Sequence, residues 1–156
     1  MNQKRIFFAL LTGIFLLSGT PQAFAQEEVI DQRKKLMKSN SKTSKALKKA
    51  VKAMDYAAIE SGTKVIIANM DRLPTLFPKG STAKNSRALK TIWSDWQGVT
   101  DNIGWVKNSA KNLAAAAAVK DAELVKLEYQ AVSTACSQCH RSYRKGRRGG
   151  KKKKKK

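Results

Sequence analysis

The 156-residue chain contains few of the residues that build disulfide frameworks or histidine-rich metal sites. It has two cysteines, Cys136 and Cys139, and one histidine, His140. A small exported fold held together by disulfides needs more cysteines, spread along the chain, so that class of fold is excluded. A structural zinc site needs four nitrogen or sulfur ligands, and the sequence offers only these three good candidates. The two cysteines therefore serve one local site.

Acidic residues are also scarce, and the resulting positive charge is unevenly distributed. The chain has 32 Lys and Arg residues against 11 Asp and Glu residues, a formal net charge of +21. Eleven of the basic residues follow His140, where no acidic residue occurs, and we predict that residues 146–156 form a disordered basic tail. Basic runs bind phosphate backbones, but no element that reads bases accompanies this one, so we expect no nucleic-acid partner.

The chain has a single long apolar run, residues 6–17, which follows Lys4 and Arg5. Farther along stands Ala23-Phe24-Ala25, the small-x-small pattern that signal peptidase recognises. The run is too short to span a bilayer comfortably, although an uncleaved anchor is an alternative. We predict that residues 1–25 are a signal peptide and that the mature protein is located in the periplasm.

No later segment alternates apolar and polar residues as a strand does, whereas apolar residues recur at helical spacings of three and four. The sequence predicts an all-α fold, an antiparallel four-helix bundle over residues 26–145. The four predicted inward faces are Ile30, Arg33, Met37, Asn40, Ser44, Leu47 and Val51; Ile59, Thr63, Ile66, Met70 and Leu73; Leu89, Trp93, Trp96, Thr100, Ile103, Val106, Ala110 and Leu113; and Leu124, Leu127, Ala131 and Ala135.

Turn and capping residues predict where these helices begin and end. Asp55 is expected to cap the second helix, and the prolines of residues 74–78 end it. A loop then runs to residue 85, and Ser86 is expected to cap the third helix. A short break at residues 119–120 leads to the fourth helix.

The sharpest chemical signal is Cys136-Ser137-Gln138-Cys139-His140. Positions 136, 139 and 140 are three and four residues apart, so on a helix both thiols and the imidazole share one face. Two thiols so placed can each add to a vinyl group of a porphyrin, and the adjacent imidazole can bind its iron. The pattern predicts one covalently attached haem c, with His140 as the proximal iron ligand.

The cysteine spacing also occurs in two other kinds of site. A thiol–disulfide redox motif of this spacing belongs to a βαβ context, which this helical sequence lacks. A zinc site lacks a fourth ligand, since thioethers such as that of Met37 are poor substitutes. If haem is present, the lone histidine excludes a second imidazole from the same chain, so the sixth iron position is left to Met, water, a weak ligand or nothing.

With these features the sequence resembles the cytochrome c-prime family of four-helix-bundle haem proteins, which carry C-x-x-C-H in the last helix. The resemblance covers nearly all of the mature chain. It rests on Arg33 followed four residues later by Met37, on Leu73-Pro-Thr-Leu-Phe-Pro78, on the Ile92-Trp93 pair, and on Tyr143 and Arg144 after the haem motif.

The resemblance implies that the residue four positions after Arg33 lies over the distal face of the haem. In the low-spin cytochrome c-556 subgroup a Met there gives His/Met ligation and a one-electron carrier, which is what Met37 leads us to expect. An aliphatic residue there would leave a five-coordinate, high-spin iron that binds or sequesters nitric oxide or other small gases. A shift of one residue would place Leu36 over the iron and favour that alternative.

The resemblance implies further roles near the haem, each with a plainer alternative. Arg33 and Arg144 are expected to pair with haem propionates or tune the iron, unless they are solvated surface charges. Phe77 and Trp93 are expected to line the haem pocket, a role close to ordinary core packing. Met37 itself could be a core methionine, as Met54 and Met70 are taken to be.

No acid–base pair or nucleophile constellation occurs in the sequence, so no enzyme activity is expected. The expected partners are acidic redox proteins, with the anionic surface of a membrane as a second possibility for the lysine tail, where each lysine contributes about 1 kcal/mol. A solvated tail without a partner is the plainer alternative. Nothing in the sequence selects between a monomer and a homodimer.

Overall fold

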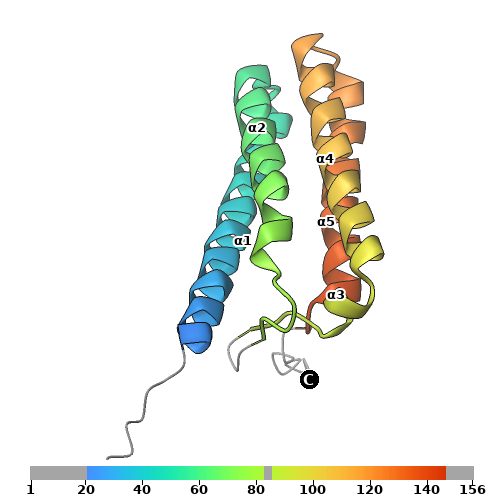
Figure 1. Ribbon diagram of the computed structural model, residues 1–156. Coiled ribbons are helices and arrows are strands. Elements are labelled where there is room, and N and C mark those ends of the chain that lie inside the picture. The colour runs from blue at the N-terminus through green and yellow to red at the C-terminus, as the bar shows by residue number, and fades with distance from the viewer. Residues whose placement is uncertain (1–20, 83–85, 147–156) are drawn as a thin grey trace, which may run out of the picture.

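Residues 21–82 and 86–146 are described by a computed structural model, and the side chains of residues 21–25 fall outside that description. Four long helices dominate: α1 (Pro21–Ala53), α2 (Tyr56–Arg72), α4 (Trp96–Ala118) and α5 (Ala122–Tyr143). Figure 1 shows an α1–α2 hairpin lying beside an α4–α5 hairpin. Helix α2 packs against α1 and α4, and α5 packs against α4 and α1, which closes the bundle. The predicted all-α four-helix bundle is confirmed.

The connection between the two hairpins contains two short helical segments. A 3₁₀ turn, η1 (Leu73–Leu76), follows α2 directly, and a single turn, α3 (Thr91–Ser94), precedes α4. The expectation that the third helix begins after Ser86 is wrong, because the chain becomes helical only at α3 and breaks again at Asp95. That break exists because Asp95 caps α4 with its side chain, which accepts a hydrogen bond from the Gly98 amide at 3.1 Å.

Aspartates begin all three of the later long helices. The Asp55 carboxylate accepts from the Ala58 amide at 3.0 Å at the start of α2, as the sequence predicts. Asp95 does the same for α4, and Asp121 accepts from the amides of Glu123 and Leu124 at the start of α5. Each carboxylate satisfies amides that have no partner within the helix and places negative charge at the positive end of the helix dipole.

The buried face of α5 agrees with the predicted one only in part, since Ala135 is fully buried as predicted. Leu124 and Leu127 are 38% and 60% exposed, so their assignment to the core is wrong. The face that packs on the core lies one residue later, about 100° around the helix, and repeats with spacings of three and four. It includes Val125, Tyr129, Val132, Cys136, Cys139 and Tyr143, with the buried Ala135 beside Cys136. The two cysteines therefore lie on the face of α5 that packs against the bundle.

The buried face of α4 follows the prediction except at its beginning. Trp96 is 37% exposed instead of buried, because it is the first residue of α4 and precedes the first turn that packs on the core. Ile92, in the short helix α3 that precedes α4, is buried. The core-facing residues of α4 are Val99, Ile103, Val106, Ala110, Leu113 and Ala117. In α2 the predicted face, from Ile59 to Leu73, is buried throughout.

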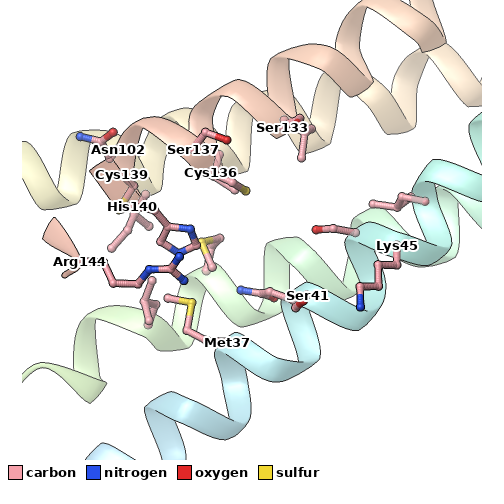
Figure 2. A pocket seen from close by; sticks show the side chains of 18 of the residues that line it. Met37, Ser41, Lys45, Asn102, Ser133, Cys136, Ser137, Cys139, His140 and Arg144 are labelled. Carbon is pink, nitrogen blue, oxygen red and sulfur yellow. The ribbon is translucent and has the colours of Figure 1, made fainter. Parts of the chain in front are cut away.

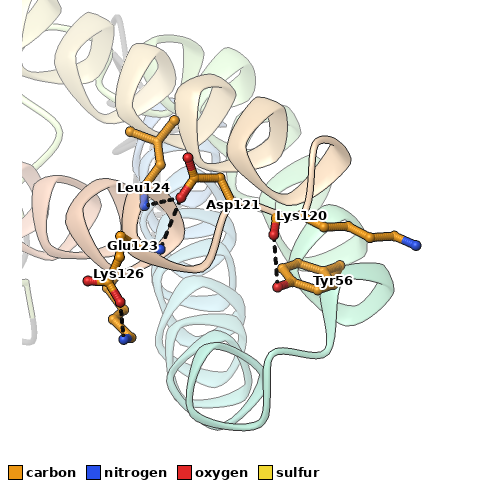
Figure 3. Close-up of polar contacts among 6 residues, drawn as sticks. All are labelled: Tyr56, Lys120, Asp121, Glu123, Leu124 and Lys126. Carbon is orange, nitrogen blue, oxygen red and sulfur yellow. Dashed lines mark hydrogen bonds and ion pairs between the residues drawn. The ribbon is translucent and has the colours of Figure 1, made fainter.

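Two tight turns lie at the end of the bundle far from the α2–α3 connection. Met54 after α1 and Lys120 after α4 both have positive φ, 53° and 56°. Beyond α4 the Lys120 amide donates to Ala117 O at 3.0 Å and the Asp121 amide to Ala116 O at 3.1 Å, which satisfies the last helical carbonyls. The Tyr56 hydroxyl donates to Lys120 O at 3.1 Å and joins the two hairpins at this end (Figure 3).

The predicted outer boundaries of the domain are only partly covered by the described residues. Helix α1 begins at Pro21, ahead of the predicted cleavage point after Ala25. Residues 1–20 of the predicted signal peptide and residues 147–156 of the predicted tail lie outside the description, so both assignments stay predictions. Within residues 21–82 and 86–146, no helix is long and apolar enough to cross a membrane.

Lys120 occupies a backbone conformation that suits glycine better than lysine, and its exposed side chain can be removed without disturbing the core. We expect Lys120→Gly to stabilise the protein by about 1 kcal/mol, because glycine adopts positive φ without steric cost. Urea unfolding followed by circular dichroism measures the change. The matched control is Lys111→Gly, in the exposed middle of α4, which should lose about 1 kcal/mol. Equal losses in both variants would contradict the turn geometry.

Candidate functional site

The bundle encloses a cavity of about 450 Å³ that is lined by all four long helices. Its volume lies in the range of cofactor and small-molecule sites. Helix α5 contributes Cys136, Cys139 and His140, and α1 contributes Met37 from the opposite side. Figure 2 shows the imidazole and the thioether pointing into the space between these two helices.

A second cavity, of about 220 Å³, adjoins the first and shares part of its lining. Met37, Cys139, His140 and Arg144 line both cavities. The smaller one is otherwise lined largely by apolar side chains, together with two further residues that the sequence singled out, Arg33 and Phe77. The fold thus brings seven of the eight predicted site residues together, although the outermost two, Arg33 and Arg144, lie more than 100 positions apart in the sequence.

The two cysteines are free and half-buried on the core-facing side of α5. Burial raises the pKa of the Cys136 thiol. Burial, followed by the proximity of Cys136, raises the pKa of Cys139 to about 11. Both side chains are therefore neutral thiols at neutral pH. This protonation does not favour a reactive dithiol redox centre, which needs a lowered thiol pKa.

His140 is half-buried on the same helix, next to Cys139. Burial lowers the pKa of its imidazole, and the positive charges of Arg144 and Arg87 lower it further. The ring is neutral at neutral pH, which is the form that binds a metal. Among the described residues, no group of three or more His, Cys, Asp or Glu side chains could hold a metal ion, so the zinc alternative lacks its ligand set.

The placement of Met37 and Leu36 bears on which residue faces the cavity. Met37 lines both cavities, whereas Leu36 lines neither and is buried in the hydrophobic core at 6% exposure. The methionine, and not its neighbour, is therefore presented toward His140. Met70, which the sequence assigned to the core, is buried there at 5% exposure but also lines the larger cavity, so it is a second thioether near the site.

Arg33 is buried at 5% exposure, not spread over the surface. Its Nη1 donates to Leu76 O at 3.1 Å and to Ser81 Oγ at 3.3 Å. Its Nη2 donates to Ser81 O at 3.1 Å and to Ser86 Oγ at 3.2 Å. The guanidinium also lies over the Phe77 ring, 4.4 Å from the ring centre, and burial lowers its pKa. The alternative that Arg33 is a solvated surface charge is wrong.

Phe77 and Trp93 have different positions relative to the cavities. Phe77 lines the smaller one. Trp93 lines neither cavity, and its indole Nε1 donates to the carbonyl oxygens of Phe77 at 3.1 Å and Pro78 at 3.0 Å. Trp93 therefore holds the segment that carries Phe77.

A contact that anchors the end of α5 is not predictable from the sequence. Three residues after His140, the Tyr143 hydroxyl donates to Asp95 Oδ2 at 2.5 Å, and this bond raises the pKa of Tyr143 to about 12. Gly98 is required beside it, because a Cβ there would overlap the Tyr143 hydroxyl and the Asp95 carboxylate. The only local signal is the capping position of Asp95, since the approach of Tyr143 depends on tertiary packing.

The chemistry of the larger cavity fits a haem c. It offers two thiols for the vinyl groups, a neutral imidazole for the iron, and apolar side chains for the macrocycle. One wall atom also lacks a partner. Asn102 donates through Nδ2 to Gly98 O at 2.7 Å, but its Oδ1 is the one buried side-chain N or O atom among the described residues without a hydrogen bond. A buried acceptor of this kind indicates that its hydrogen-bond donor comes from a bound molecule or from a side chain that reorients.

Known proteins that are similar to this chain over most of its length are cytochromes. A family model described as Cytochrome C' matches residues 28–144. A cytochrome c' of Rhodopseudomonas palustris is 31% identical over 90% of this chain and 97% of its own length. A cytochrome c-556 of the same organism is 27% identical over 86% of this chain and 94% of its own length.

Solved structures share the fold. One is a nitric oxide complex of a mutant cytochrome c prime from Alcaligenes xylosoxidans. It superimposes with a TM-score of 0.70 over 78% of this chain and 97% of its own length, at 22% identity. At that identity the likeness concerns the fold.

Replacing both cysteines tests the attachment. We expect Cys136→Ala/Cys139→Ala to lose all haem that survives denaturing electrophoresis, because no thiol remains to form a thioether bond. Haem-dependent peroxidase staining of the gel and the mass of the intact chain measure it. Ser137→Ala, between the two cysteines, is the matched control and should keep the haem. Haem retained after denaturation in the double variant would refute attachment at this motif.

Proposed function

Since the chain belongs to the cytochrome c-prime family and binds a covalently attached haem c, we propose that it carries single electrons with His140 and Met37 as the two axial ligands of the iron. In this proposal Cys136 and Cys139 supply the two thioether bonds. When bound, the haem supplies the iron whose oxidation state changes by one electron. The chain's own residues hold it, exclude water and set its potential.

The observation that carries the proposal is the placement of Met37. Its thioether lines both cavities from α1, across from His140 on α5, while Leu36 packs elsewhere in the core. Thioether sulfur is a soft ligand that favours ferrous iron and raises the reduction potential relative to a harder ligand. Apolar neighbours around the site, such as Leu73 and Ile103, act in the same direction by limiting solvent access.

Gas binding is the second candidate, and the comparisons support it more directly than they support the electron carrier. The Rhodopseudomonas palustris cytochrome c' is 31% identical to this chain, whereas the cytochrome c-556 of that organism is 27% identical. One structural neighbour was solved with nitric oxide. In this candidate Met37 only packs over the distal face, and the smaller cavity beside it receives the gas. The two functions differ in a single bond, between iron and the Met37 sulfur.

Two volume-conserving substitutions test that bond. We expect the wild-type protein to be low-spin, with a weak sulfur-to-iron absorption band in the oxidised form. We expect Met37→Leu to become high-spin and to bind carbon monoxide readily, because leucine fills the space without offering a ligand. Absorption spectra of both oxidation states measure this.

The matched control is Met70→Leu, which removes the other thioether from the larger cavity and should leave the spectrum unchanged. A high-spin wild-type protein that binds carbon monoxide as readily as Met37→Leu would rule out the electron carrier and support gas binding. If the sulfur-to-iron band disappeared in Met70→Leu but not in Met37→Leu, the iron ligand would be Met70 and the proposal for Met37 would be wrong.

We further propose that the protein works in the periplasm, because its N-terminus has the pattern of an exported chain. No catalytic acid–base pair is part of the proposal.

The proposed partner is inferred from the positive charge of α1. Helix α1 has no acidic residue after Asp31 and carries exposed lysines along its length: Lys34, Lys35, Lys38, Lys42, Lys45, Lys48, Lys49 and Lys52. Lys45 and Lys48 also line the larger cavity. An acidic redox partner docking there would approach the haem directly.

Small redox reagents of opposite charge test the docking surface. At low ionic strength we expect Lys45→Gln/Lys48→Gln to slow oxidation of the reduced protein by ferricyanide, an anion, and to speed oxidation by tris(phenanthroline)cobalt(III), a cation. Stopped-flow rates against salt concentration measure both. Lys64→Gln/Lys111→Gln removes the same charge from exposed positions that line neither cavity. Equal changes in the two double variants would mean that only net charge matters.

A further inference from the structure

We propose that Arg33 is a positioning residue whose guanidinium fixes the connection between α2 and α3 against α1, and thereby holds Phe77 in the wall of the smaller cavity, next to the proposed haem site. The inference assumes the proposed haem site, but not which ligand closes the iron on the Met37 side. It differs from the role that the sequence resemblance implies, in which Arg33 is a charge partner of the haem propionates.

The hydrogen-bond inventory of Arg33 carries the argument. A guanidinium has five N–H donors, four of them on the two terminal nitrogens. All four are directed at acceptors of residues 76–86, namely two backbone carbonyls and two serine hydroxyls. Only the Nε–H is left for any other partner. The bidentate face with which arginine binds a carboxylate is therefore already taken by the connection.

Every acceptor in this set is neutral. No ion pair of Arg33 with an acidic side chain occurs among the described residues, although the guanidinium is buried. A buried cation is costly unless hydrogen bonds satisfy it, and hydrogen bonds to a charged group are stronger than those between neutral groups. Contact with the Phe77 ring adds cation–π attraction. The fork geometry of arginine, more than its charge, matches this set of acceptors.

The same segment is held from its other side. Trp93 of α3 donates to the carbonyls of Phe77 and Pro78, so Phe77 lies between the contacts of α1 and those of α3. The Phe77 ring lines the smaller cavity together with Met37. Arg33 precedes Met37 by one helical turn on the same face of α1, so one face of α1 both fixes the connection and presents the distal side chain.

The holoprotein distinguishes fixation from charge pairing. Arg33→Lys keeps the charge and loses the fork, whereas Arg33→Met loses both. If Arg33 fixes the connection, both variants should bind carbon monoxide several-fold faster in the ferrous state than their parent, because Phe77 is released. If it serves as a charge partner, Arg33→Lys should restore parental rates, and that result would overturn the proposal.

Two choices of background and control keep this test separate from the test of the function. The rates are measured in the Met37→Leu background, where the distal position is open whether or not Met37 binds iron in the wild type. Lys64→Met, which removes an exposed positive charge from α2 at a position that lines neither cavity, is the control and should leave the rate unchanged. An acceleration equal to that of Arg33→Met would assign the effect to charge alone and refute the proposal.

A second measurement covers the case in which an Arg33 variant fails to fold. Ser81→Ala and Ser86→Ala each remove one acceptor without changing any charge. We expect both to speed tryptic cleavage after Lys79, an exposed residue in the same connection, with little change in the unfolding midpoint. Mass spectrometry of the fragments measures the rate. Cleavage at the wild-type rate in both serine variants would show that these bonds do not fix the connection.

Discussion

The face of α5 that packs against the bundle is also the face that presents the two thiols, and most of the site depends on this coincidence. Val125, Val132 and Tyr143 pack on the other helices through the same spacing that carries Cys136 and Cys139 inward. The cofactor is consequently bound where the core would otherwise continue. Anchoring Tyr143 to Asp95 fixes the last turn of this helix and with it the position of His140.

The wall of the cavity opposite α5 is formed by α1, which contributes Met37, Asn40 and Ser44 to the lining. Its inward face is unusual for a bundle helix because Arg33, Asn40 and Ser44 stand among the apolar residues. In a bundle without a cofactor these would be poor core residues. Here they border the cavities or fix the long connection, so the polar interruptions mark the part of α1 that faces the site instead of another helix.

The sequence predicts the architecture and the attachment motif well, because both depend on local patterns. Helical spacing and the capping position of Asp55 depend on neighbours within a few residues, and both are confirmed. The sequence predicts the wrong inward residues only in the first half of α5, because leucine is a common core residue, whereas Leu127 is 60% exposed. The acceptors of Arg33 and the partner of Tyr143 are set by tertiary approach over more than 40 residues, which no local pattern encodes.

Under the proposed ligation, the haem would be held by both hairpins, through α5 and through α1, and this has a thermodynamic consequence. Under the proposed ligation, α5 holds the haem covalently while α1 holds it through the Met37 sulfur. The iron would then act as a cross-link between the first and last helices. Because linkage is reciprocal, any preference of that sulfur for ferrous over ferric iron would appear equally as a greater resistance of the reduced bundle to unfolding. The stability of the fold would then depend on the electron it carries.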